Sequence, residues 1–197
     1  SLSDPNRDAL VVIGQFRTGK VPAPYLQPLT DLPGLFLARL IGAVAAYNLV
    51  VLVTFPLAAA SAYLLGRHVL GSHLGALVAA LAYAFLPFHV MQAGGHPHAA
   101  QAQWIPLFLL ALWRFIDQPG PGRAMFVLGA AAAAALSDFY SGFIIAVLTP
   151  FAAAVYALRS NTLPIQTRWK NLALTLGAFM VVIAIGYVAL RSAFPTV

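Results

Sequence analysis

The chain has 197 residues, of which 61% are hydrophobic and only 8% are charged. Soluble domains carry roughly 25% charged residues, so this composition excludes an ordinary water-soluble domain and makes the lipid bilayer the expected surroundings. The formal net charge is +6, but the cations stand singly at the ends of apolar runs. They form no basic face, so we expect no nucleic-acid partner.

The first 31 residues precede any run that could cross a bilayer, and we expect them to form an extracytoplasmic loop. They open with Ser1 and contain no signal peptide, while Val197 follows an apolar run directly. We therefore expect a fragment of a longer protein, with residues 32–197 as its transmembrane domain. Leu32–Ile41 is apolar but too short to span, which predicts an interfacial helix or the entry to the first span, with Asp31 as the N-cap of the helix.

About six apolar runs follow, and each is expected to be a membrane-spanning helix. Arg67-His68 should separate the first two runs, Leu86-Pro87 should close the second, and the Pro/Gly-rich segment 118–122 should join the third to the fourth. No strand-like alternation is visible, so the predicted fold is an all-α polytopic bundle. The expected spans are Val44–Leu65, Val69–Phe88, Trp104–Ile116, Ala124–Leu136, Phe143–Leu158 and Leu172–Leu190.

The distribution of cations predicts the orientation of these spans. The second connection, His89–Gln103, and the fourth, Ser137–Gly142, contain no Lys or Arg. Because cytoplasmic loops are enriched in Lys and Arg, the second and fourth connections should be extracytoplasmic and the protein a multi-pass protein of the plasma (inner) membrane. The first, third and fifth connections carry the cations Arg67, Arg114, Arg123, Arg159, Arg168 and Lys170.

Asp138 lies in one of the outward connections, beside Tyr140. A carboxylate near the bilayer is costly unless it faces a cavity or a partner, which makes Asp138 a candidate for ligand contact. The simpler interpretation is that Asp138 caps the helix that starts near Ser141. Asp8, in the first segment, is interpreted as a solvated loop charge.

His96-Pro97-His98 invites comparison with a metal site. Two imidazoles in positions i and i+2 need further ligands, which Asp4, Asp138 or His89 could supply. A divalent metal is the less favoured interpretation, and we expect neither a metal nor another cofactor. With no cysteine in the chain, thiolate ligands are excluded.

Six short motifs follow one another along the chain. They are Asp4-Pro5-Asn6, Tyr47-Asn48-Leu49, Tyr83-Ala84-Phe85-Leu86-Pro87-Phe88, Gly95-His96, Gln103-Trp104-Ile105-Pro106-Leu107 and Asp138-Phe139-Tyr140. In this order they resemble landmarks of bacterial polytopic membrane proteins related to GT-C glycosyltransferases, and the resemblance covers almost the whole chain.

The resemblance implies an enzyme that transfers a sugar from a polyprenyl-phosphate-linked donor to an extracytoplasmic acceptor. It also implies an Asp in the first outer loop as general base, and Asp4 matches that position. The leaving phosphate needs cationic stabilisation, for which Arg7, Arg17, Lys20 and Arg39 are candidates. The residues expected to bind substrate are Arg7, Arg39, His96, His98, Asp138 and Tyr140.

The chain departs from the family pattern in several respects. A first transmembrane helix and a C-terminal periplasmic domain are not seen, and Ser3 stands where Gly commonly precedes Asp-Pro. Asp138 also stands where a small polar residue is expected. The alternative is a non-catalytic transmembrane subunit that packs against other membrane subunits. An enzyme should bring Asp4, His96 and Asp138 to one cavity, whereas a structural subunit should leave them apart.

Overall fold

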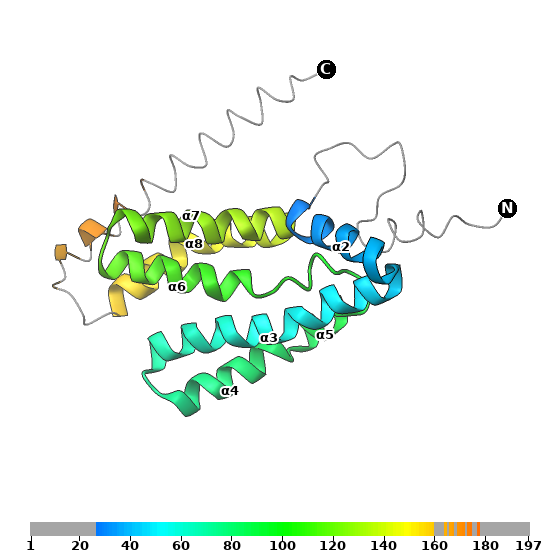
Figure 1. Ribbon diagram of the computed structural model, residues 1–197. Coiled ribbons are helices and arrows are strands. Elements are labelled where there is room, and N and C mark those ends of the chain that lie inside the picture. The colour runs from blue at the N-terminus through cyan, green and yellow to red at the C-terminus, as the bar shows by residue number, and fades with distance from the viewer. Residues whose placement is uncertain are drawn as a thin grey trace, which may run out of the picture.

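The computed structural model of the chain describes residues 27–159 and, beyond them, residues 164, 166, 167, 169–171, 173, 174 and 177. All regular secondary structure in this part of the chain is helical, which confirms the predicted all-α class (Figure 1). The helices are α2 (Pro28–Ile41), α3 (Ala43–Leu70), α4 (His73–Ala84), α5 (Pro87–Ala93), α6 (Trp104–Asp117), α7 (Pro121–Ser137) and α8 (Phe139–Arg159).

Helix α2 begins earlier than the sequence suggested. Its N-cap is Gln27 and its first residue is Pro28, a position where the missing N–H costs nothing. Asp31 therefore lies inside the first turn, and the prediction that it is the N-cap is wrong. Its Oδ2 accepts the backbone N–H of Gln27 at 2.9 Å, so the carboxylate still serves the start of the helix from within.

The turn between α3 and α4 lies at Gly71-Ser72 and not at Arg67-His68, which are part of α3. Gly71 adopts φ +65°, the left-handed conformation that suits glycine at a helix end, and its N–H donates to the Arg67 carbonyl. Ser72 then caps α4 by accepting the N–H of Gly75. The left-handed Gly71 therefore ends α3, and the Ser72 cap starts α4.

The expected second span is a broken helix. Helix α4 ends at Ala84, Pro87 starts α5, and the two helices are bent by 43° relative to each other. Proline lacks the N–H that would continue the hydrogen-bond ladder, which accounts for the position of the break.

Two of the described helices, α3 and α8, are long and apolar enough to cross a membrane, and the bent α4–α5 pair makes a third if it counts as one span. Helix α6 has 14 residues and α7 has 17, so at about 1.5 Å per residue neither alone reaches the roughly 30 Å of a hydrocarbon core. The expected span Leu172–Leu190 lies almost entirely outside the described residues. The number of about six spans is therefore not confirmed.

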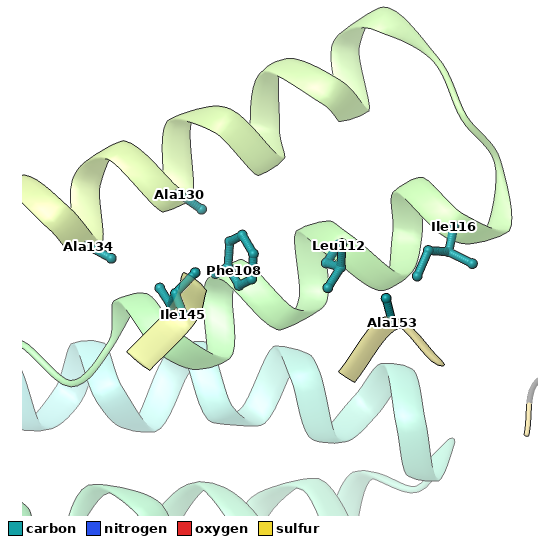
Figure 2. Packing of buried hydrophobic residues seen from close by; sticks show 7 residues of the cluster. All are labelled: Phe108, Leu112, Ile116, Ala130, Ala134, Ile145 and Ala153. Atoms are coloured by element: carbon teal, nitrogen blue, oxygen red, sulfur yellow. The ribbon is translucent and has the colours of Figure 1, made fainter. Parts of the chain in front are cut away.

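Helix α6 is the centre of the bundle, packed against α3, α7 and α8. Figure 2 shows Phe108 of α6 between Ala130 of α7 and Ile145 of α8. Small residues on α7 allow the larger α6 side chains to fill the space between the helices. The buried cluster consists of Phe108, Leu112, Ile116, Ala130, Ala134, Ile145 and Ala153.

The two ends of the bundle differ in charge. Figure 1 shows the α3–α4 turn and the α6–α7 connection at one end, and α2, α5 and the α7–α8 junction at the other. The first end carries Arg67, Arg114 and Arg123. At the second end, Arg39 in the last turn of α2 is the one Lys or Arg among the described residues.

Helices α7 and α8 approach closely at Gly142. A Cβ at this position would lie 2.9 Å from both Cα and Cβ of Ala135, whereas a Cβ on the exposed Gly129 of α7 would meet nothing within 4 Å. We expect Gly142→Ala to lower the free energy of unfolding by about 1–3 kcal/mol through overpacking. The matched Gly129→Ala change should be neutral or should raise it by about 0.5–1 kcal/mol. Unfolding in mixed micelles, followed by circular dichroism, measures both. Equal effects of the two variants would contradict this packing.

Candidate functional site

A cavity of about 790 Å³ opens at the end of the bundle that holds α2, α5 and the α7–α8 junction. One part of its wall is apolar, with side chains from α4–α6 and α8. Another part is polar, with two histidines from the segment between α5 and α6. The lining residues are Gln27, Tyr83, Leu86, Phe88, His89, Gln92, His96, His98, Ala99, Ala102, Ile105, Asp138, Tyr140, Ser141, Ile144 and Leu148.

Four of the residues expected to bind substrate line this cavity: His96, His98, Asp138 and Tyr140. They come from two connections that the helix order brings to the same end of the bundle. Arg39 is exposed in the last turn of α2 and is not among the lining residues. The predicted base, Asp4, and the predicted phosphate-binding residues Arg7, Arg17 and Lys20 lie outside the described residues.

Asp31 is a buried carboxylate that contacts one of the lining residues, His98. Its side chain is 1% exposed, and its Oδ1 lies 2.7 Å from Nε2 of His98, 67 residues further along the chain. Because Oδ2 accepts the Gln27 N–H, both carboxylate oxygens have partners. Next to it, the Thr30 hydroxyl donates to the Ser137 carbonyl at 3.0 Å. These contacts attach α2 both to the loop before α6 and to the end of α7.

Asp138 is buried at the junction of α7 and α8, where it caps α8 as the sequence suggested, although the helix begins at Phe139. Its Oδ2 accepts both the backbone N–H and the hydroxyl of Ser141, each at 2.9 Å. Within the described part of the chain, its Oδ1 makes no hydrogen bond and Asp138 lines the cavity. One carboxylate oxygen thus serves the fold while the other is available to a ligand.

His89 is a lining residue that the sequence suggested only as a possible metal ligand. It is 1% exposed and stacked on Phe55, with 4.3 Å between ring centroids. Its Nδ1 lies 2.7 Å from the Ala84 carbonyl, which the break after α4 leaves without a helical donor, and its Nε2 lies 2.9 Å from the Thr54 hydroxyl. His89 therefore supplies the Ala84 carbonyl with the hydrogen-bond donor that the backbone lacks at the bend. The sequence could not predict this role, because it depends on the position of the break between α4 and α5.

Within residues 27–159 and the few described beyond them, no group of three or more His, Cys, Asp or Glu side chains is arranged to hold a metal ion. The chemistry that this part of the cavity offers is hydrogen bonding. Imidazole, carboxylate, amide and phenol groups can bind hydroxyls, while the apolar wall can hold a hydrocarbon chain. Among the described lining residues none is Lys or Arg, so cations for a phosphate would have to come from elsewhere.

Comparisons of this chain with family models, with curated proteins and with solved structures found no match. The fold and the side chains of the cavity therefore carry the functional argument.

The two roles of Asp138 can be separated by substitution. Asn caps helices about as well as Asp, so Asp138→Asn should leave the free energy of unfolding nearly unchanged, whereas Asp138→Ala should lower it by about 1 kcal/mol. Detergent-solubilised variants compared in thermal and denaturant unfolding test this expectation. If Asp138→Asn is as destabilising as Asp138→Ala, the fold requires the negative charge of the carboxylate. The assignment of Oδ2 to the helix cap and of Oδ1 to a ligand is then wrong.

Proposed function

We propose that this chain is part of a multi-pass membrane glycosyltransferase that transfers a sugar from a polyprenyl-phosphate-linked donor to an acceptor hydroxyl. The observation that carries the proposal is the amphipathic cavity. It gathers His96, His98, Asp138 and Tyr140, which the GT-C resemblance and the outward loops had singled out, beside an apolar wall.

The shape and chemistry of the cavity suit such a donor. Its volume of about 790 Å³ lies within the roughly 300–1,000 Å³ typical of ligand pockets. Leu86, Ile144 and Leu148 offer an apolar surface for isoprenoid units, and the polar lining side chains offer partners for a sugar. A ligand with a hydrocarbon chain and a polar head contacts both the apolar and the polar lining residues. A fully polar substrate would leave the apolar lining residues without a partner.

The charge difference between the ends of the bundle supports an extracytoplasmic position for the cavity. The cations Arg67, Arg114 and Arg123 belong to the opposite end, which the positive-inside rule assigns to the cytoplasm. In this orientation, α6 and α7 would complete their spans with flanking residues, and the run Leu172–Leu190 would add the last of about six spans in an inner membrane.

The alternative, a non-catalytic subunit of a larger membrane assembly, was expected to leave Asp4, His96 and Asp138 apart. Asp4 lies outside the described residues, and the cavity shared by His96 and Asp138 supports ligand binding. In the proposed reaction Asp4 removes the proton of the acceptor hydroxyl as its oxygen attacks the anomeric carbon. The bond from that carbon to the phosphate breaks, and polyprenyl phosphate leaves with the electron pair, stabilised by Arg7, Arg17 or Lys20.

The proposal is tested with the full chain in proteoliposomes that contain a radiolabelled polyprenyl-phosphate sugar. Loss of a general base typically costs 10²–10⁴-fold in rate, so Asp4→Asn should reduce sugar transfer by at least about 100-fold. Asp8→Asn, a change of the same kind four residues along, should leave transfer within about twofold of the wild type, because a solvated loop charge contributes little. Undiminished transfer by Asp4→Asn would exclude Asp4 as the base.

A further inference from the structure

We infer that Asp31 and His98 form a hydroxyl-recognition site in the cavity, in which the ring nitrogen Nδ1 of His98 accepts a hydrogen bond from the sugar of the ligand. The inference rests on the proposed function for the sugar itself. It assigns to Asp31 the role of a positioning residue that fixes which nitrogen of His98 carries the proton.

The tautomer of His98 follows from its partner. A carboxylate oxygen accepts hydrogen bonds and donates none, so the contact of 2.7 Å between Asp31 Oδ1 and His98 Nε2 requires the proton on Nε2. In the neutral imidazole, Nδ1 then presents a lone pair. Within the described part of the chain, Nδ1 has no hydrogen-bond partner, and His98 lines the cavity.

The burial of the pair makes this arrangement rigid. Asp31 is 1% exposed and its second oxygen accepts the Gln27 N–H at 2.9 Å, so the carboxylate cannot turn away from His98. Asp31 holds the ring through Nε2, and we place Nδ1 toward the cavity that His98 lines.

A bare Nδ1 selects the ligand group that it contacts. It attracts a hydroxyl or an N–H, which donates, and repels a phosphate oxygen, whose lone pairs would face its own. The sugar of a lipid-linked donor should therefore lie against His98, with the phosphate directed away from it. His98 thus defines the orientation of the ligand in the cavity, which neither the volume of the cavity nor the composition of its wall reveals.

The substitution Asp31→Asn should reverse the preference of His98 for a hydroxyl over a phosphate without changing the shape of the side chain at position 31. The Gln27 N–H is a fixed donor, so the amide oxygen of Asn must face it. The amide NH₂ then faces Nε2 of His98, which must accept, and the proton moves to Nδ1. A site that accepted a hydrogen bond from a hydroxyl becomes one that donates a hydrogen bond, and it can now bind a phosphate oxygen.

The test uses ¹⁵N-histidine NMR of the full chain in nanodiscs, with the His98 signals assigned by their loss in His98→Gln. Two probes are titrated separately, a long-chain alkyl glucoside that has no phosphate and a polyprenyl phosphate that has no sugar. In the wild type we expect a protonated Nε2 and a bare Nδ1 whose signal shifts with the glucoside and not with the phosphate. Asp31→Asn should exchange the two nitrogen types, so that Nδ1 now shifts with the polyprenyl phosphate.

Asp117→Asn, at the opposite end of the bundle, is the matched control and should alter neither the His98 signals nor glucoside binding. A proton on Nδ1 of wild-type His98, or glucoside binding that leaves Nδ1 unshifted, would overturn the inference. The wild-type spectrum decides this even if Asp31→Asn does not fold. Because the readout is tautomer and binding, a chain that binds the glucoside through His98 but transfers no sugar would contradict the proposed function alone.

Discussion

The buried carboxylate of Asp31 governs how one end of this bundle is built. A charge removed from water must be paired and hydrogen-bonded, and here the partners are His98 and the backbone of Gln27. Since His98 belongs to the segment between α5 and α6, satisfying Asp31 draws that segment against α2. The Thr30 hydroxyl adds a contact to the end of α7. His98 and Asp138, which line the cavity, lie in the segments that these contacts hold together.

The middle of the bundle has a different physical basis. Helices α3 and α4 meet through alanine, so their backbones approach closely and several of their large apolar side chains face outward. Ala58 and Ala62 of α3 and Ala76 and Ala80 of α4 are buried, while Leu52 and Leu74 on the same helices are 64% and 72% exposed. In a bilayer such leucines contact lipid, and close packing of small residues holds the helices together. The polar contacts of Asp31 and Thr30, by contrast, lie at one end of the bundle.

The sequence predicted the helices better than their ends. Apolar runs gave α3, α6, α7 and α8 within a few residues, because length and composition suffice for a helix in lipid. The ends depended on single residues with special conformations: Gly71 in the left-handed region, and Pro28 as a first helical residue. The break before Pro87 was read as the end of a span, whereas the chain continues as α5 at an angle of 43°.

The site was predictable in part for a similar reason. His96, His98 and Asp138 could be grouped because alternate connections of a helical bundle share one end. The pairing of His98 with Asp31 could not be foreseen, since it joins residues 67 positions apart through the path of α2. The role of His89 likewise depended on a carbonyl freed at the bend. Sequence patterns locate polar residues along the chain, but hydrogen-bond partners are set by tertiary structure.

The proposed function requires the cavity to hold a lipid-linked sugar with its head among the polar side chains. Photo-crosslinking tests it most directly, with a polyprenyl-phosphate sugar that carries a photoreactive group on the sugar and with mass spectrometry of the labelled peptides. We expect the photoreactive sugar to label the segment around His96 and His98 and the start of α8 near Tyr140. An excess of unlabelled donor should suppress this labelling. Labels spread over the lipid-facing side of α3 and unaffected by competitor would contradict the proposed function.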